Sequence, residues 1–232
     1  MTRGCLILTA AVGVVMAGHF AAPVLAADRQ PTARDRYYEA ANDDNNNDPD
    51  WRGVRTSILL RRDKKNGDPD IREVGENFRF LNGDSLRLRI ESNLDGYLYL
   101  FLRDSDGKMR LLYPYEGGKA DSHKIEAFSA RFVPGRDKAW FRFDNEPGIE
   151  QVFLFLSAQP IAELEQLRKS SSPAGLKQLE RLIAHNGPPT SMRFDEEDLE
   201  NGGDQGATFY VEKRTARRQF LVRRFDLSHD AE

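Results

Sequence analysis

Residues 96–114 are apolar on both faces of an expected β-hairpin, and this feature limits the folds that the chain can adopt. The stretch reads as two strands joined by a turn at Asp104-Ser-Asp-Gly107. Because side chains alternate along a strand, Tyr97, Tyr99 and Phe101 share one face. The other face carries Leu98, Leu100 and Leu102. A strand that is apolar on both faces is normally covered on both, so the rest of the chain must supply two covers.

Other short segments of the chain also have strand patterns, with turn signals between them. Residues 149–157 form a second segment that is apolar on both faces. Leu86, Leu88 and Ile90 alternate with charged residues, as in a strand with one buried face. Many short strands joined by turns are typical of a mainly β, antiparallel β-sandwich. The strand at 86–90 is thus one expected source of a cover for the hairpin.

A helical insertion is predicted at about residues 159–187, where apolar residues recur every three or four positions. Ser172 and Pro173 suit the start of a second helix within it. The helices come late and together instead of alternating with strands, which argues against a parallel α/β sheet. We therefore expect an appended C-terminal αα-hairpin as the other cover, followed by final strands near 208–211 and 219–226.

The first 26 residues have the pattern of a Sec-type signal peptide, with a short basic start and an apolar run that begins at Cys5. Val24-Leu25-Ala26 predicts cleavage after Ala26. A retained membrane anchor is the alternative, but the run is shorter than the ~20 residues that a span needs. We expect a periplasmic or secreted protein with no transmembrane segment after signal cleavage. Cys5 is the only cysteine, so the mature chain would have no disulfide.

The remaining residues divide into a polar linker and one domain. Residues 27–50 include an Asp- and Asn-rich run at 43–50 and are predicted to be disordered. That run also leaves a calcium-stabilised structural domain as an alternative, although the EF-hand spacing is absent. Residues 51–232 are expected to form a single β-sandwich domain. The net charge of -3 argues against a nucleic-acid partner, because such proteins usually carry a basic excess.

No catalytic motif accompanies these patterns. His123, His185 and His229 lack a metal-ligand spacing, and neither a serine nucleophile elbow nor a phosphate-binding glycine loop is present. We therefore predict no enzymatic activity, no cofactor and no metal site. Paired carboxylates such as Asp104 and Asp106 leave a hydrolase of a cell-wall polymer as an alternative, if two of them face each other.

Two groups of residues remain as candidates for binding. The first makes the C-terminal part basic and could meet an anionic partner or form a solvated strand face; it comprises Lys213, Arg214, Arg217, Arg218, Arg223 and Arg224. The second comprises Tyr113, Tyr115, Trp140 and Arg142. Trp140 and Arg142 alternate with the expected core residues Phe141 and Phe143, and the two tyrosines flank a loop. We predict the second group as contact residues for an envelope protein or polymer.

Several short pieces of the sequence have the order and spacing found in a known protein family. They are Gly83-Asp84, Gly96-Tyr-Leu-Tyr-Leu100, Asp106-Gly107, Leu112-Tyr-Pro114, Pro134, Pro147-Gly148 and Ser157-Ala-Gln-Pro160. From about Asn82 to Pro160 the sequence resembles a bacterial exported domain-of-unknown-function family, DUF family four-three-eight-four. The resemblance implies an immunoglobulin-like β-sandwich module, seen in exported proteins and attached to kinase or peptidase domains. It carries no catalytic residues, so an exported, non-enzymatic binding module of the cell envelope is the predicted function.

Overall fold

The computed structural model describes residues 30–42, 49–115, 122–135, 139–143, 146–169, 172–185, 192–196, 206–215 and 219–230. The predicted signal peptide and most of the Asp- and Asn-rich run lie outside these residues. Among the residues described, no helix is both long enough and apolar enough to cross a membrane.

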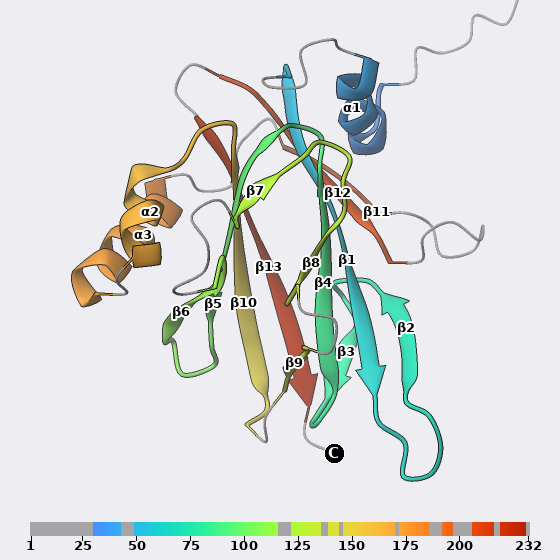
Figure 1. Cartoon of the computed structure of the whole chain (residues 1–232). Coiled ribbons are helices and arrows are strands. Elements are labelled where there is room, and N and C mark those ends of the chain that lie inside the picture. Colours follow the sequence, from blue (N-terminus) through green and yellow to red (C-terminus); the bar gives the residue numbers. More distant parts are fainter. Residues whose placement is uncertain are drawn as a thin grey trace, which may run out of the picture. The chain divides into compact units, whose positions relative to one another are not determined.

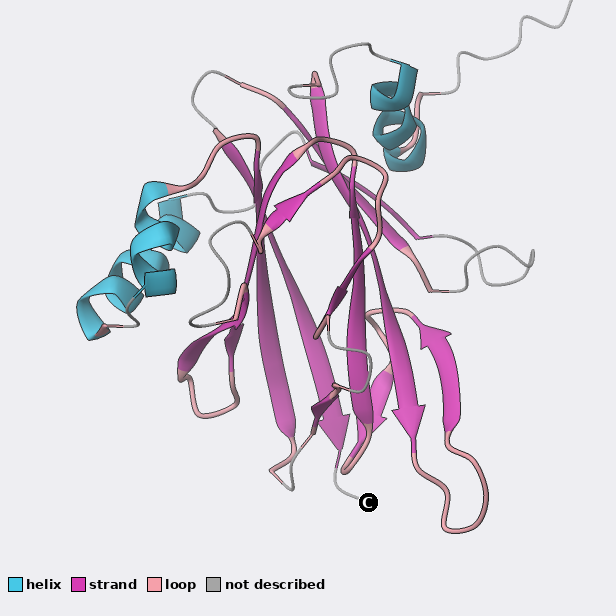
Figure 2. Ribbon diagram, in the orientation of Figure 1, coloured by secondary structure: helices cyan, strands magenta, loops and turns pink. Residues whose placement is uncertain are grey.

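The described chain is mainly β, with its strands in two sheets (Figures 1 and 2). The seven-stranded sheet contains β1 (Trp51–Arg62), β2 (Asp70–Val74), β4 (Ser85–Ser92), β8 (Arg131–Val133), β9 (Phe141–Arg142), β11 (Met192–Glu196) and β12 (Thr208–Lys213). Its order is β11-β12-β1-β4-β8, with β2 beside β1 and β9 beside β4. The six-stranded sheet contains β3 (Arg79–Leu81), β5 (Gly96–Arg103), β6 (Met109–Tyr113), β7 (Lys124–Ile125), β10 (Gly148–Ser157) and β13 (Phe220–Asp230). Its order is β3-β13-β10-β5-β6, with β7 beside β5.

One strand pair departs from the predicted antiparallel arrangement. β3 and β13 run parallel, with Arg79 opposite Ser228 and Leu81 opposite Asp230. Parallel strands cannot be joined by a tight hairpin, and here the two strands come from distant parts of the sequence. No hairpin turn joins these two strands, so the sequence contains no local signal that predicts their parallel pairing.

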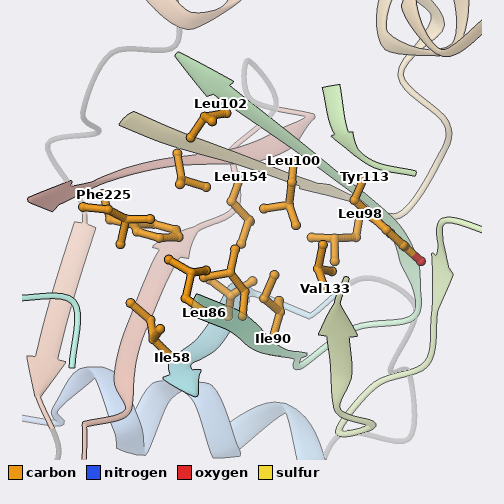
Figure 3. Close-up of a cluster of buried hydrophobic side chains, with 14 of the residues drawn as sticks. Ile58, Leu86, Ile90, Leu98, Leu100, Leu102, Tyr113, Val133, Leu154 and Phe225 are labelled. Carbon is orange, nitrogen blue, oxygen red and sulfur yellow. The ribbon is translucent and has the colours of Figure 1, made fainter. Parts of the chain in front are cut away.

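The two strands that are apolar on both faces, β5 and β10, are neighbours in the six-stranded sheet, with Leu100 opposite Leu154. The leucines on one face of β5 and β10 belong to a buried cluster between the two sheets (Figure 3). The seven-stranded sheet contributes residues such as Ile58 and Ile90 to this cluster. The other face packs against the helix pair α2 (Ala162–Lys169) and α3 (Pro173–His185). That second cluster contains Tyr99, Phe101, Phe153, Phe155, Leu164, Leu167 and Leu179. Both expected covers are therefore present.

Two glycines make the central hairpin possible. Gly96 starts β5 so close to β10 that an added Cβ would lie 2.2 Å from the carbonyl oxygen of Ser157. Gly107 has a φ of 79°, in the left-handed region that glycine adopts without strain. The Asp104 carboxylate accepts a hydrogen bond from the backbone N–H of Lys108 at 2.7 Å and closes the same turn.

A short helix replaces part of the predicted linker. α1 spans Ala33–Glu39 and is followed by the 3-10 turn η1 (Ala40–Asn42). Thr32 and Asp35 form a capping box, in which each side chain accepts the other's backbone N–H. Tyr37 is fully buried against Phe209 of β12. The expectation of disorder is therefore wrong for α1, because a single buried tyrosine anchors an otherwise polar segment.

Candidate functional site

A pocket of about 260 Å³ lies between the two sheets, on the side where β6 ends one sheet and β9 flanks β4 in the other. We call it the edge pocket. Its lining comes from β4, β5, β6, β9, β10 and β13, and consists of Leu86, Leu88, Leu102, Arg110, Leu112, Phe141, Arg142, Glu150, Val152 and Leu227. Both sheets thus contribute side chains to one concave site.

The innermost part of the edge pocket is lined by apolar side chains. Its floor is formed by core residues that each expose 5% or less of their surface, namely Leu86, Leu88, Leu102, Val152 and Leu227. Leu112 and Phe141 are half-buried and pack against the same core cluster. A ligand that entered the pocket would therefore meet the side of the inter-sheet core.

Charged residues complete the lining. Arg110 and Arg142 are exposed, and Glu150 is half-buried. Within the described part of the chain, neither arginine forms an ion pair. Arg110 lies opposite Leu102 and shares its inner face, whereas Arg142 lies opposite Ser85 and is therefore on the face of β9 away from Leu86 and Phe141. The charged side chains on the inner face of the pocket are thus Arg110 and Glu150.

Leu112 of the pocket lining lies at an irregularity in β6. In the β5–β6 ladder, Tyr113 lies opposite Leu100 and Leu111 lies opposite Phe101. Leu112 therefore has no partner of its own in β5, as in a β-bulge, and it lines the pocket. Bulges that redirect a side chain are common near functional sites.

A larger hollow of about 960 Å³ lies elsewhere, between the start of β1, residues 157–163 and the start of β13. Its lining includes the acidic residues Asp50 and Glu163 and the basic residues Arg52 and Arg214. This balance of charges selects no ligand chemistry. We therefore take the edge pocket as the candidate site, despite its smaller volume.

The predicted contact residues do not form one exposed surface. Tyr113 exposes only 4% of its surface, and its hydroxyl donates a hydrogen bond to the Ser122 carbonyl. Tyr113 is therefore not placed to act as a surface contact residue, as was predicted, because the irregular β5–β6 register turns it into the core opposite Leu100. Tyr115 is half-buried, and its hydroxyl accepts the Gly135 N–H at 2.9 Å.

The other two predicted contact residues lie near the edge pocket. Arg142 lines it, and Trp140 precedes β9 by one residue. The Trp140 ring is half-buried beneath the guanidinium groups of Arg87 and Arg61, at 4.7 and 6.0 Å from the ring centre. A role of these residues in binding stays a prediction. Arg110 was not predicted, because no sequence signal indicates that it lines a pocket.

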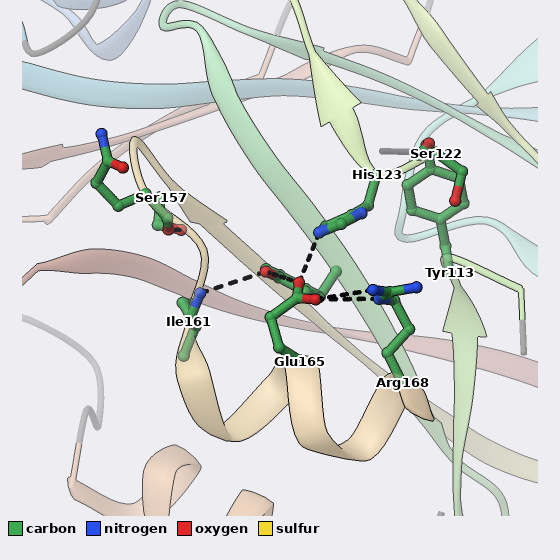
Figure 4. Close-up of polar contacts among 9 residues, drawn as sticks. Tyr113, Ser122, His123, Ser157, Ile161, Glu165 and Arg168 are labelled. Carbon is green, nitrogen blue, oxygen red and sulfur yellow. Dashed lines mark hydrogen bonds and ion pairs between the residues drawn. The ribbon is translucent and has the colours of Figure 1, made fainter. Parts of the chain in front are cut away.

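A second polar cluster, which we call the helix-docking cluster, joins α2 to the six-stranded sheet (Figure 4). The Tyr99 hydroxyl donates to Glu165 Oε1 at 2.6 Å, and His123 Nε2 lies 2.6 Å from the same oxygen. The Arg168 guanidinium donates to Glu165 Oε2 at 3.0 and 3.1 Å. His123 exposes 2% of its surface, and the contacts of this cluster hold α2 against β5.

The pKa shifts of Glu165 and Tyr99 favour the hydrogen bonds that hold α2 against the six-stranded sheet. Burial alone would raise the pKa of Glu165, but the hydrogen bonds from Tyr99 and Arg168 and the nearby His123 outweigh burial, and the pKa lies below its usual value. Burial, followed by the hydrogen bond to Glu165, raises the pKa of Tyr99. These shifts keep Glu165 charged and Tyr99 neutral, so the contacts between β5 and α2 are preserved.

The other chemical candidates have local explanations. Asp104 and Asp106 lie in the β5–β6 turn, where Asp106 pairs with Lys108 at 3.0 Å. Arg223 is buried and pairs with Glu76, whereas Arg224 is exposed and pairs with Asp226 at 3.3 Å. Arg223 and Arg224 therefore do not form one surface, and Arg217 and Arg218 of the predicted basic group lie outside the described residues. In the described ranges, no group of three or more His, Cys, Asp or Glu residues could hold a metal ion.

Comparison with known proteins gives one match. No curated protein and no solved structure matches the chain. A family model described as "Domain of unknown function (DUF4384)" matches residues 79–160, which run from β3 to just beyond β10. Every residue that lines the edge pocket except Leu227 lies in this segment. The predicted resemblance is thus confirmed: residues 79–160 of this chain are similar to the family described as Domain of unknown function (DUF4384).

Proposed function

We propose that this protein is an exported, non-enzymatic binding module of the bacterial cell envelope, with an immunoglobulin-like β-sandwich that holds its ligand in the edge pocket. Export is supported by the signal-peptide pattern of residues 1–26. The sandwich is supported by the two sheets that share one hydrophobic core. Small-molecule sites are typically concave and apolar with a few placed polar groups, which is how the edge pocket is built.

The observation that carries this proposal is the concave edge pocket itself, where an apolar floor between the two sheets lies beside Arg110 and Glu150. Binding is favoured over hydrolysis because hydrolysis of a glycosidic bond uses two facing carboxyl groups. The lining of the edge pocket contributes one, Glu150. A hydrolase acting on a wall polymer remains the alternative for carboxylates elsewhere in the chain.

A variant that fills the edge pocket tests the proposal. We expect a soluble envelope extract to raise the melting temperature of the purified protein, because a ligand that binds only the folded state stabilises it. At a ligand concentration of about 100 times Kd, the gain is ~2.7 kcal/mol, or a shift of about 5–10 °C for a domain of this size. Leu112→Trp should place an indole in the pocket and reduce that shift to near zero.

Arg181→Gln is the matched control, because Arg181 is exposed on α3 and does not line the pocket. It should retain the full shift. The melting temperature of each variant without extract shows whether the substitution itself disturbs the fold. An extract that stabilises the wild-type protein and Leu112→Trp equally, or that stabilises neither, would rule out a ligand in the edge pocket.

A further inference from the structure

We propose that the outer face of the seven-stranded sheet binds an acidic polysaccharide through its arginine side chains. This inference goes beyond the proposed function, because the edge pocket lies between the sheets and this surface lies on the side of the seven-stranded sheet away from the six-stranded one. We call it the arginine face, and it comprises Arg61, Arg87, Arg89, Phe132, Trp140 and Arg142.

The strand register places the arginines on one face. The core between the sheets takes even-numbered residues of β1 and β4, so the odd-numbered residues of these strands face outward. Arg61 lies opposite Ser85, and Ser85 lies opposite Arg142 of β9, so these three residues form one row across three strands. Arg87 and Arg89 continue the outer face along β4. A ligand on this face would therefore meet guanidinium groups from three neighbouring strands.

The Trp140 ring brings two of these guanidinium groups together. Arg87 lies 4.7 Å and Arg61 lies 6.0 Å from the centre of the ring. The Arg87 guanidinium also donates hydrogen bonds to the Ala139 carbonyl at 2.8 and 3.2 Å. These contacts restrict the Arg87 side chain before a ligand arrives, which lowers the entropic cost of binding.

The charge of this face favours an anionic ligand. The outward arginines of β1, β4 and β9 are Arg55, Arg61, Arg87, Arg89 and Arg142. The acidic residues beside them on β2, on β4 and just after β1 are Glu73, Glu91 and Asp63. Five arginines thus lie among three carboxylates, and the excess of two positive charges attracts an anion.

Exposed guanidinium groups are available to a ligand. Arg142 is exposed and forms no ion pair with the part of the chain that the structure describes. Arg61 pairs with Asp63 at 3.0 Å, but their side chains are 36% and 60% exposed, and such surface pairs contribute little. Guanidinium groups bind carboxylate oxygens through paired, charge-assisted hydrogen bonds, so the carboxylates of a ligand can replace this pair.

The extent of the face and its aromatic side chains favour a polysaccharide. Adjacent strands lie about 4.8 Å apart, so the backbones at Arg61 and Arg142 are about 10 Å apart, and a polymer with repeated carboxylates can bind both arginines at once. Phe132 lies opposite Arg89 and exposes 38% of its surface. The face of an aromatic ring attracts the C–H groups of a sugar ring, whereas an inorganic polyanion has no apolar part to pack there.

Binding of the purified protein to immobilised polygalacturonate, measured by biolayer interferometry, tests this inference. We expect binding that weakens as the salt concentration rises, because salt screens exposed charges. Dextran has sugar rings without charge and should not bind. Polyphosphate has charge without apolar rings and should bind at least tenfold more weakly than polygalacturonate. Failure of polygalacturonate to bind, or dextran or polyphosphate binding as tightly, would overturn the acidic polysaccharide.

Substitutions locate the site. Arg87→Gln and Arg142→Gln should each weaken polygalacturonate binding about tenfold, because each removes charge-assisted hydrogen bonds. Phe132→Ala should weaken it at least threefold and leave polyphosphate binding unchanged. Arg181→Gln, the control on α3, should bind like the wild-type protein. Unchanged binding by Arg142→Gln, whose exposed side chain can be replaced without disturbing the fold, would overturn the site.

The arginine face and the edge pocket are tested separately. Leu112→Trp should bind polygalacturonate like the wild-type protein, because Leu112 lines the pocket between the sheets. Loss of polygalacturonate binding in a folded Leu112→Trp variant would place the polymer at the edge pocket and overturn the arginine face.

Discussion

Leu154→Ala and Phe155→Ala are each expected to lower the free energy of unfolding by several kcal/mol, although the two side chains point to opposite faces of β10. Leu154 is fully buried in the cluster between the sheets, and Phe155 is fully buried under the helix pair. Removal of a buried leucine costs about 2–5 kcal/mol, and removal of a buried phenylalanine about 3–5 kcal/mol, because a cavity remains. Urea unfolding followed by circular dichroism measures both.

Ile149→Ala is the matched control within the same strand, since Ile149 exposes 54% of its surface. Its substitution should change the free energy of unfolding by about 0.5 kcal/mol or less. A Phe155→Ala variant as stable as Ile149→Ala would contradict the assignment of α2 and α3 as a cover for β10. A small effect of Leu154→Ala would contradict the shared core between the sheets.

Arg223→Met is expected to destabilise the protein by about 3–5 kcal/mol, which is typical when one partner of a buried ion pair is removed. The Arg223 side chain exposes 3% of its surface and that of Glu76 exposes 9%. Arg223 also donates to the Thr56 hydroxyl at 3.1 Å, and that hydroxyl donates to Glu76 at 2.6 Å. The substitution would leave the Glu76 carboxylate buried without its guanidinium, and it would cut a link between the two sheets.

A double-mutant cycle with Glu76→Met isolates this effect. The double variant Arg223→Met/Glu76→Met should recover most of the lost stability, because replacing a buried ion pair by apolar residues is often neutral. Arg224→Met serves as the control, since Arg224 is exposed on the other face of β13. Equal destabilisation by Arg223→Met and Arg224→Met, or a double variant as unstable as the sum of the two single ones, would contradict the buried pair.

Local patterns in the sequence predicted the elements that stabilise the core. The alternation in residues 96–103 and 149–157 identified two strands with two buried faces, and the helical period after residue 160 identified their second cover. These signals are local, because each depends on the spacing of apolar residues within one segment. α1 was missed because its composition is polar and only Ala33 and Tyr37 of its seven residues are buried.

The edge pocket could not be predicted from the sequence in the same way. Its lining comes from six strands between Leu86 and Leu227, and only the packing of the two sheets brings these residues together. The sequence indicated Arg142 through its alternation with Phe141, but it did not indicate Arg110. The inward turn of Tyr113 depends on the register shift between β5 and β6, which leaves no local signal either.

The family match and the fold do not have the same boundaries. Residues 79–160 contain β3 to β10, whereas β1, β12 and β13 lie outside the match and complete the two sheets. The helices α1, α2 and α3 also lie outside it. The matched segment therefore supplies nearly all of the lining of the edge pocket. The remainder of the chain supplies the strands that complete the two sheets and the helices that pack on them.

Methyl-resolved NMR of the leucine and valine side chains, with and without the envelope extract, tests the central claim most directly. A ligand in the edge pocket should shift the methyl signals of its lining, which are those of Leu86, Leu88, Leu102, Leu112, Val152 and Leu227. The signals of Leu164, Leu167 and Leu179, which lie under the helix pair, should stay in place. Shifts confined to the helix-pair leucines, or no shifts at all, would contradict a binding site between β6 and β9.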